Sequence, residues 1–373
     1  MPLSNAILCD AQHIALNTAI REILKNKESE FQISVLECEK VKLYAKITPM
    51  LKLLIVKTSS MGDVIHNLPI LSDIRMHFPD AQIDWVVEEG FVDILKLHPQ
   101  INTIIPVAIR RWRKNPFNKQ TKQEFQAFLT QLKAEHYDYI IDTQSLLKSA
   151  IIACLANGKR YGLNPKTARE WLAGFLYQHR LSVSRKQHAV DHNRQIAALA
   201  LDYKVPTSEP DYGLSRADLA SQIHMQLPEK YVMAFHATSR DSKLWPMGHW
   251  VSLGILLAKQ GITLCLPWSS EKEKSKAEII ATHVPNAIVL PKSSIATLAQ
   301  ITAGATAVVG VDTGLIHLAV AMDVPSIAIY TDTHPEFNGT YGGVNALAIN
   351  LGGKGRLPEP DEVFNAFNRL GTF

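Results

Sequence analysis

Cysteine is scarce in this chain of 373 residues, and its placement excludes the common cysteine-based metal sites. The four cysteines (Cys9, Cys38, Cys154 and Cys265) are scattered, and no Cys-x-x-Cys or Cys/His pairing gives a zinc site. Structural zinc sites are built from such pairs at short, fixed spacings. We therefore expect reduced thiols in a cytosolic protein and no bound metal.

Long apolar runs and strong net charge are also missing. No uninterrupted apolar run approaches the roughly 20 residues needed to span a bilayer. The N-terminus lacks the basic start and apolar core of a secretory signal. We expect a soluble chain that could still lie on a membrane surface. The net charge of +4 is too small to indicate a nucleic-acid partner, so any anion-binding site must be local.

Two nucleotide-binding signatures are absent as well. The sequence has no G-x-x-x-x-G-K-[ST] phosphate loop and no G-x-G-x-x-G after a predicted strand. The chain is thus neither an obvious kinase-type NTPase nor an obvious dehydrogenase.

Short β-branched segments alternating with amphipathic ones predict the fold. The composition, 46% hydrophobic and 20% charged, is that of a globular protein, and the length favours two domains. In the first half we predict strands at 51–56, 82–87, 101–107 and 137–143, and helices at 63–78, 122–135 and 188–201. In the second half we predict strands at 231–236, 262–266, 287–290, 307–311 and 326–330, and helices near 248–259, 271–282, 295–303, 315–322 and 361–370.

Strands separated by helices predict parallel sheets with right-handed crossovers. We therefore predict two doubly wound α/β domains, at residues 50–205 and 215–373. Residues 202–215, rich in Pro, Ser and Asp, form the predicted linker. Residues 1–49 form an N-terminal extension with one predicted helix (11–26) and one strand pattern (31–47), which we interpret as an appendage or a misassigned start.

Ligands of open α/β sheets bind at the carboxyl ends of the strands, and two loops at such ends carry a candidate carboxylate and candidate phosphate ligands. The loop "TSSMGD" at 58–63 lets the backbone approach a ligand and would place Asp63 at the mouth of a cleft, with Gly62 leaving room for a sugar. The alternative is that Asp63 only caps the following helix. The loop "HATSRDSKLWP" at 236–246 offers Thr238, Ser239 and Lys243 to phosphate oxygens, or is simply a solvated polar loop.

A third loop has the features of a diphosphate site. In "VVGVDTGLIHLAVA", residues 308–321, a strand ends and a helix begins at "DTG". The backbone N–H groups and the dipole of that helix favour an anion near Thr313 and Gly314. His317 lies about one turn into the helix, on the face expected to point to the ligand. The alternative is a capped helix with a buried histidine.

A fourth loop is strongly basic. Residues 94–123 contain no Asp or Glu, while six basic residues and two aromatic ones crowd together in "IRRWRKNPFNKQTK" at 109–122. Arginines can grip a carboxylate or phosphate with two hydrogen bonds. A solvated basic surface is the alternative, but the missing acidic counter-charge favours an anion site. Together the four loops suggest transfer from a nucleotide-activated donor to an acidic acceptor.

Several motifs resemble the ADP-heptose:lipopolysaccharide heptosyltransferase family. They are "LIVKTSSMGDVIHNLP", "DWVVEEGF", "IPVAIRRWRK", "YDYIIDTQSLLKSA", "TARE", "QHAVDHNR", "HATSRDSKLWP" and "VDTGLIHLAVAMDVP". They follow the family's order from residue 51 to about 345, and "KTSSMGD" with "IPVAIRRWRK" resembles its heptosyltransferase I branch. The resemblance implies a GT-B fold, in which two Rossmann-like domains face a cleft, and a metal-independent inverting transferase.

The same resemblance implies the substrates and the setting. The donor would be ADP-heptose, with no cofactor, and L-glycero-D-manno-heptose would go to the Kdo region of lipid A in the lipopolysaccharide inner core. Residues 50–205 would bind the acceptor and residues 215–373 the donor. We expect a cytoplasmic protein, peripheral on the inner membrane, monomeric and without a nucleic-acid partner.

Site residues follow from the matching motifs. Asp63 matches the proposed general base, and Lys243 matches the catalytic lysine that holds the donor diphosphate. Other donor-binding positions match Thr238, Ser239, Glu273, Asp312, Thr313, Gly314 and His317. Acceptor-binding positions match Ser60, Gly62, Arg110, Arg113, Lys114 and Arg169.

The sequence also departs from the family pattern. Thr331, Asp332 and Thr333 stand where the family reads Gly-Pro-Thr, and Ser293 replaces a methionine expected near the adenine. Residues 1–49 have no counterpart. Two other classes stay open: a GT-B nucleotide-sugar epimerase, which needs no acceptor loop, and a non-catalytic protein that binds a nucleotide sugar or lipid A.

Overall fold

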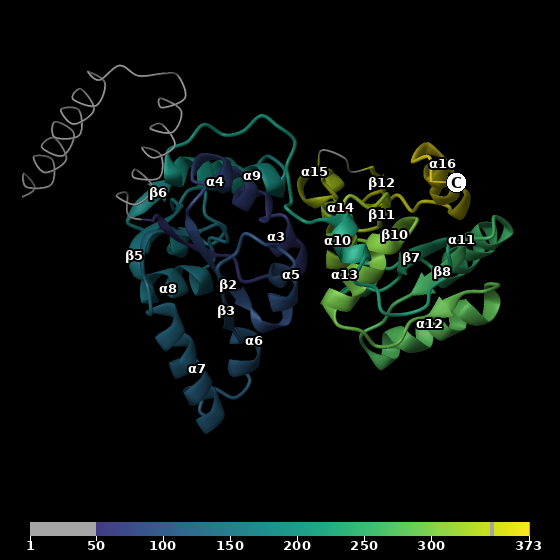
Figure 1. Ribbon diagram of the computed structural model, residues 1–373, viewed down its shortest axis with the longest axis horizontal. Coiled ribbons are helices and arrows are strands. Elements are labelled where there is room, and N and C mark those ends of the chain that lie inside the picture. Colours follow the sequence, from purple (N-terminus) through teal and green to yellow (C-terminus); the bar gives the residue numbers. More distant parts are fainter. Residues whose placement is uncertain (1–49, 344–346, 373) are drawn as a thin grey trace, which may run out of the picture. The chain divides into compact units, whose positions relative to one another are not determined.

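Parallel strands form the framework of the computed structural model, which describes residues 50–343 and 347–372. The helix expected at 11–26 and the strand expected at 31–47 lie outside the described residues. Residues Leu51–Phe373 form one unit, and its elements carry the labels of Figure 1.

The first sheet has six parallel strands in the order β3-β2-β1-β4-β5-β6. Its central strand β1 pairs with β2 and β4 on either side, and Leu53–Val56 of β1 are fully buried. A strand buried on both faces reads as a continuous apolar run, as "LLIV" does. The strands are β1 Lys52–Val56, β2 Gln82–Glu88, β3 Thr103–Val107, β4 His136–Asp142, β5 Asn157–Leu163 and β6 His179–Leu181.

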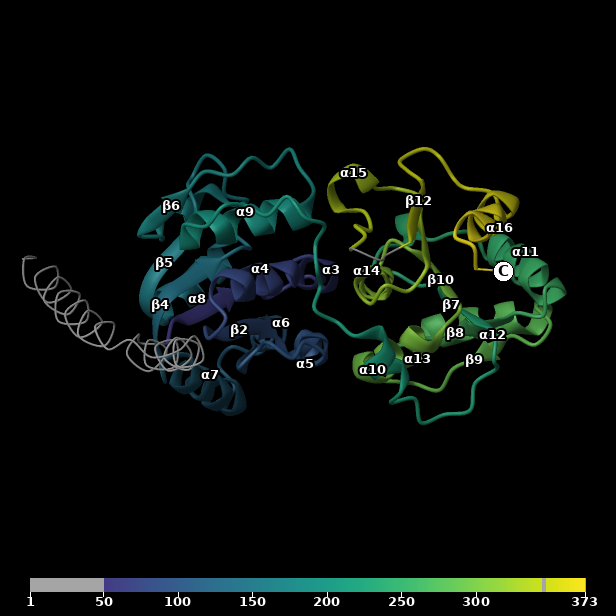
Figure 2. The ribbon, with the colours of Figure 1, turned by 45° about the horizontal axis from the view of Figure 1, so that its top comes forward.

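Helices cover both faces of this sheet. Leu53 and Ile55 face the apolar cluster that includes α4 and α9, which lie side by side in Figures 1 and 2, while Leu54 and Val56 face α7 and α8. The helices are α3 Met61–Ile65, α4 Pro69–His77, η1 Glu89–Phe91, α5 Val92–Lys96, α6 Ile109–Trp112, α7 Lys119–Leu132, α8 Leu147–Leu155, η2 Trp171–Phe175 and α9 Ala189–Leu201.

The second sheet repeats this plan, with six parallel strands in the order β12-β11-β10-β7-β8-β9. They are β7 Tyr231–Phe235, β8 Thr263–Leu266, β9 Ile288–Val289, β10 Ala307–Val311, β11 Ser326–Tyr330 and β12 Ala348–Gly352. One face packs against α11, α12 and α16, and the other against α13 and α14. The helices are α10 Arg216–Ala220, η3 Asp241–Lys243, α11 Met247–Lys259, α12 Glu271–His283, α13 Ile295–Gly304, α14 Gly314–Ala321, α15 Pro335–Asn338 and α16 Pro360–Arg369.

The predicted doubly wound α/β architecture is therefore confirmed, with differences in detail. The helices α5, α6, α8, α10 and α15 were not predicted. The single helix expected at 63–78 is wrong: the chain forms α3 and α4, because Pro69 begins α4 and has no N–H to continue the hydrogen-bond ladder from α3. Strands β5, β6 and β12 were not predicted. The segment "NGKRYGL" of β5 lacks an apolar run, and β6 has only three residues.

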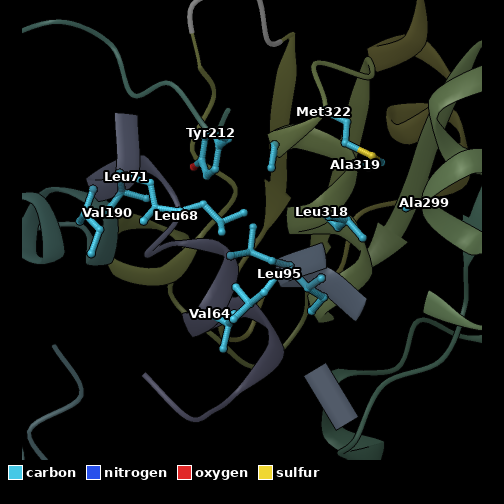
Figure 3. Packing of buried hydrophobic residues seen from close by; sticks show 14 of the residues in the cluster. Val64, Leu68, Leu71, Leu95, Val190, Tyr212, Ala299, Leu318, Ala319 and Met322 are labelled. Atoms are coloured by element: carbon cyan, nitrogen blue, oxygen red, sulfur yellow. The ribbon is translucent and has the colours of Figure 1, made fainter. Parts of the chain in front are cut away.

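An apolar cluster joins the two halves of the unit. Figure 3 shows Val64 and Leu68 from the first half, and Leu318 of α14 and Met322 just after it, as members of this one buried cluster. Residues 202–215 contain no helix or strand and run from α9 to α10. None of the helices in the described part of the chain has the length and apolarity to cross a bilayer.

Candidate functional site

A cavity of about 900 Å³ opens where the carboxyl ends of β1 and β4 face those of β7 and β10. Of the residues predicted from the sequence, five from the first half line it: Ser60, Gly62, Asp63, Arg110 and Arg169. Seven from the second half line the same cavity: Thr238, Ser239, Lys243, Asp312, Thr313, Gly314 and His317.

Three predicted residues are not among those that line the cavity: Arg113, Lys114 and Glu273. Arg113 and Lys114 are exposed just after α6. The Glu273 carboxylate accepts hydrogen bonds from the backbone N–H and the hydroxyl of Ser269, at 2.7 and 2.8 Å, at the start of α12.

The Asp63 carboxylate is held by the turn that precedes it. Ser60, and not Asp63, is the N-cap of α3; Asp63 is the third residue of that helix and closes a capping box with Ser60. Oδ2 of Asp63 accepts hydrogen bonds from the backbone N–H and the hydroxyl of Ser60, both at 2.8 Å. Within the described residues Oδ1 accepts no hydrogen bond, which leaves it available to a ligand.

The ionisation of Asp63 depends on a buried lysine. Burial tends to raise the pKa of the Asp63 carboxyl, but the Lys57 charge and the two Ser60 hydrogen bonds outweigh it, so the pKa lies below the ordinary value. Nζ of Lys57 donates to the Thr143 carbonyl at 3.0 Å and to Oδ1 of Asn193 at 3.4 Å. Asp63 is therefore ionised at neutral pH.

Sequence reasoning missed Lys57, although its signal was present. It follows "LLIV" directly, and a lysine at the end of a buried strand rarely loses contact with water unless it has partners. Burial lowers the pKa of Lys57, while the charges of Asp63 and Asp142 raise it.

On the opposite wall of the cavity, Asp312 forms hydrogen bonds with residues of several loops. Its Oδ2 accepts hydrogen bonds from Nζ of Lys243 at 2.6 Å and from the hydroxyl of Thr333 at 2.7 Å. The hydroxyl of Thr238 donates to the Asp312 carbonyl at 2.9 Å. Burial would raise the pKa of Asp312, but its bonds to His317, Lys243 and Thr333 bring it far below the ordinary range.

Helix α14 presents its N-terminus to the same cavity. Thr313 is the N-cap and Gly314 the first residue, and both line the cavity. The free N–H groups and the dipole of this helix favour an anion there. Thr333, which follows the two positions where the sequence departs from the family pattern, contributes to the same wall through its hydrogen bond to Asp312.

The two glycines at the crossing of α3 and α14 serve helix packing. A Cβ on Gly62 would lie 3.2 Å from Cδ2 of His317, and a Cβ on Gly314 would lie 2.2 Å from Sδ of Met61. Glycine at position 62 therefore lets α3 approach the His317 ring, and the expectation that Gly62 borders a sugar stays a prediction. His317 is itself fixed by a 3.0 Å contact between its Nδ1 and Nε2 of His66.

The basic loop has acidic partners that its own sequence does not contain. Arg111 pairs with Glu89 at 2.9 Å and with Glu124 at 2.7 Å. The expectation that this loop lacks counter-charge is thus wrong, because folding brings in carboxylates from either side of residues 94–123. Arg110 lines the cavity, with its guanidinium 5.2 Å from the Phe91 ring centre.

The cavity also has a lining segment that sequence reasoning did not assign. It lies at and before the start of α9 and comprises Arg185, Gln187, Ala189, His192 and Asn193. Most of it falls within "QHAVDHNR", a motif that carried the family resemblance without a role for any residue. Polar residues in an otherwise apolar helix were the available signal.

Sequence similarity to known proteins identifies the family of this chain. Residues 125–361 match glycosyltransferase family 9 (heptosyltransferase). The chain is 44% identical over 296 residues to lipopolysaccharide heptosyltransferase 1 of Escherichia coli K12, which covers 78% of this chain and 91% of that protein. It is also 44% identical over 293 residues to the enzyme of the same name from Pseudomonas aeruginosa, covering 78% and 82%.

Solved structures of similar proteins have the same fold. The E. coli heptosyltransferase WaaC, solved with ADP, superimposes with a TM-score of 0.80 at 40% identity, covering 86% of this chain and 100% of that one. E. coli ADP-heptose heptosyltransferase II superimposes with a TM-score of 0.68 at 19% identity, covering 86% and 98%, which shows a shared fold.

Proposed function

Since this chain belongs to glycosyltransferase family 9, the heptosyltransferases, we propose that it transfers L-glycero-D-manno-heptose from ADP-heptose to the Kdo region of lipid A. It is a glycosyltransferase of GT-B fold and a heptosyltransferase I of lipopolysaccharide core biosynthesis. The observation that carries the detailed proposal is that Asp63 and the Lys243–Asp312 pair line one cavity.

The donor diphosphate is proposed to bind against the second half of the unit, residues 215–373. A relative of 40% identity was solved with ADP and another structure holds ADP-2-deoxy-2-fluoro heptose. In this chain Lys243 and the N-terminus of α14 offer positive charge at one wall. Charge that develops on ADP as the glycosidic bond breaks would be stabilised there by groups already in place.

The acceptor is proposed to bind against the first half, residues 50–205. Arg110 and Arg169 line the cavity beside Asp63 and would hold the acidic groups of Kdo through charge-assisted hydrogen bonds. Ser60, which fixes Asp63, would border the same subsite. Arg113 and Lys114, exposed beyond the lining, would add long-range attraction, and Glu273 would reach the donor ribose only after the Ser269 contacts are exchanged.

Asp63 is proposed as the general base. Its free Oδ1 would accept the proton of the attacking acceptor hydroxyl while that oxygen bonds to the anomeric carbon and ADP departs from the opposite side. A single displacement of this kind inverts the configuration. A positioned base contributes roughly 10²- to 10⁴-fold to a rate. Because the pKa of Asp63 is lowered, the carboxylate is already ionised at neutral pH.

No cofactor is needed for this chemistry, and Lys243 with the α14 N-terminus would replace a metal at the diphosphate. We further propose that the protein acts as a monomer on the cytoplasmic face of the inner membrane, where a lipid-borne acceptor is presented. The epimerase and non-catalytic alternatives are set aside, since the chain belongs to a family of transferases.

The test is an assay of purified protein with ADP-heptose and Kdo-lipid A, in which ADP release and the mass of the lipid product are followed. We expect the amount of ADP released to equal the amount of heptose-extended lipid formed. EDTA should not lower the rate of either. ADP release without a product of increased mass would indicate hydrolysis. Inhibition by EDTA that magnesium reverses would contradict the metal-independent mechanism.

A further inference from the structure

An exposed apolar surface lies beside the cavity, and the proposed chemistry does not use it. Three side chains of the short helix η2 are turned to solvent: Trp171 (61% exposed), Leu172 (47%) and Phe175 (52%). From α8, which contacts η2, Ile151 is 47% exposed and Leu147 38%. We call these five residues the apolar tip. Exposed apolar groups of this size gathered in one place generally mark a binding surface.

The tip is rigidly attached. The Glu170 carboxylate accepts a hydrogen bond from the backbone N–H of Leu147 at 2.6 Å and so ties the start of η2 to the start of α8. The Trp171 and Phe175 rings meet edge to face with centroids 5.8 Å apart. Buried Ala173 and Gly174 anchor the inner side of η2. Its apolar side chains are therefore presented to solvent by an ordered helix.

The stretch of sequence that carries the tip is strongly basic. Residues 143–190 contain one acidic residue, Glu170, and eight basic ones: Lys148, Lys159, Arg160, Lys166, Arg169, Arg180, Arg185 and Lys186. Across the described part of the chain, none of these eight forms an ion pair. In the loop 109–122, by contrast, Arg111 is paired with two glutamates.

Some of these charges adjoin the tip directly. The Arg180 guanidinium lies 5.7 Å from the Phe175 ring centre and donates to the Phe175 carbonyl at 3.3 Å. Lys166 follows Pro165, whose backbone lies against Gly174 of η2. Arg169, two residues before Trp171, lines the cavity. The tip is therefore continuous with the cavity wall that faces the proposed acceptor.

We propose that the apolar tip and its basic surround are the surface by which this protein docks on an anionic lipid bilayer. Trp and Phe side chains settle at the level of lipid headgroups, and basic residues are attracted by anionic lipids. Docking through the tip would bring Arg169 and the cavity mouth to the bilayer surface. The inference rests on the proposed function only in taking the acceptor to be lipid-borne.

The test measures docking apart from catalysis. The full chain is sedimented with phosphatidylcholine vesicles and with vesicles in which part of that lipid is phosphatidylglycerol. We expect stronger binding to the anionic vesicles, weakened by salt. The double variant Trp171→Ser/Leu172→Ser should lose at least about tenfold in vesicle affinity, since two large apolar groups no longer enter the interface. The double variant Lys166→Gln/Arg180→Gln should lose roughly fivefold in vesicle affinity for each charge removed. This loss should occur only on the anionic vesicles.

Two matched variants serve as controls. Ile279→Ser removes a side chain of similar exposure (46%) from α12 of the second half, and Phe117→Ser removes the most exposed aromatic residue (87%) from the other basic loop. Both should bind vesicles as the unchanged protein does. Thermal unfolding confirms that each variant is folded. Loss of binding in Phe117→Ser with none in Trp171→Ser/Leu172→Ser would overturn the assignment.

Turnover separates this inference from the proposed function. On Kdo-lipid A embedded in vesicles the tip variant should be slower, whereas on a deacylated, water-soluble acceptor it should match the unchanged protein. If the unchanged protein transfers heptose to neither acceptor, the proposed function is refuted. The vesicle-binding result then tests the docking surface independently. A tip variant that binds vesicles normally, or that only dissociates a dimer, would refute the docking surface.

Discussion

At the scale of single residues, the walls of the cavity are set by side-chain pairs. On one wall the charge of Lys57 acts on Asp63, six positions further along the same loop. On the other wall Lys243 pairs with Asp312, 69 positions away. The loops that carry Asp63, Lys243 and Asp312 could be found from the pattern of strand, turn and helix. The contact of Lys243 with Asp312 could not, because a contact between two distant loops is a property of the folded chain.

The basic loop gives a prediction at this scale. Arg110 lines the cavity, whereas Arg113 and Lys114 are exposed outside its lining. Arg110→Ala should therefore raise the KM for the acceptor by roughly tenfold, the value of one charge-assisted hydrogen bond. Arg113→Ala and Lys114→Ala should change it by less than about threefold, since exposed charges are screened.

Donor affinity, measured by titration of ADP, serves as the control for these three variants. It should stay unchanged in all of them, because the loop belongs to the first half of the unit. A loss of ADP affinity in Arg110→Ala would mean that this residue serves the donor.

At the scale of elements, the alternation of strands and helices was readable from the sequence because buried parallel strands are continuous apolar runs. The sequence did not predict the elements that form only because adjacent strands or helices hold them in place. Strand β5 has a polar sequence and is held between β4 and β6. The helix predicted at 63–78 is split because Pro69 overrides an apolar period that continues on both sides of it.

The crossing of α3 and α14 gives a second prediction. A Cβ at position 314 would overlap the Met61 side chain at 2.2 Å from Sδ, whereas one at position 62 would sit 3.2 Å from the His317 ring. Gly314→Ala should therefore lower the free energy of unfolding by about 1–3 kcal/mol, as overpacking does, and Gly62→Ala by less. Urea denaturation measures both.

A second-site change checks the cause of that loss. Combining Gly314→Ala with Met61→Ala removes the overlapping side chain and should restore part of the stability lost in Gly314→Ala alone. Additive losses in the double variant would show that the two positions are not in contact, and that another effect destabilises Gly314→Ala.

At the scale of the whole molecule, buried histidines connect the two halves. Nε2 of His188 contacts the Gly339 carbonyl at 3.1 Å, and the His66 ring lies between those of His188 and His317. Burial lowers the pKa of His188 to about 4, and it lowers the pKa of His66 well below 6.5. These contacts favour the neutral ring in the folded state.

This arrangement predicts a pH dependence of stability. A histidine with a pKa of about 4 when folded and 6.5 when unfolded is protonated first in the unfolded chain, so stability is complete above pH 6.5 and falls as pH drops towards 4. At about pH 5 the loss is on the order of 2 kcal/mol for one such residue. His188→Asn keeps an N-cap residue for α9 and should lose correspondingly less stability between about pH 7.5 and about pH 5.

Urea denaturation of both proteins at the two pH values makes the comparison. Other buried histidines and the carboxylates titrate in both proteins, so the difference between them isolates His188. An equal loss of stability in the variant would show that His188 already binds its proton in the folded state.

The N-terminal extension gives a prediction about the whole chain. The first strand of the described fold begins at Lys52, and the match to WaaC covers all of that structure while leaving part of this chain outside. Deletion of residues 1–49 should therefore leave the rate of heptose transfer and the thermal unfolding temperature nearly unchanged. A truncated protein that unfolds at much lower temperature would show that these residues complete the fold.

The central claim is that Asp63 takes the proton from the acceptor hydroxyl, and Asp63→Asn tests it most directly. Asparagine can still accept the Ser60 hydrogen bonds but cannot take up a proton. The variant should fold, bind ADP with unchanged affinity and lose at least ~100-fold in turnover, the lower limit for a general base. Ser60→Ala, which keeps the carboxylate and one of its two hydrogen bonds, should lose far less. Near-normal ADP release by Asp63→Asn, with ADP-heptose and Kdo-lipid A both saturating, would contradict the account and return Asp63 to a purely structural role.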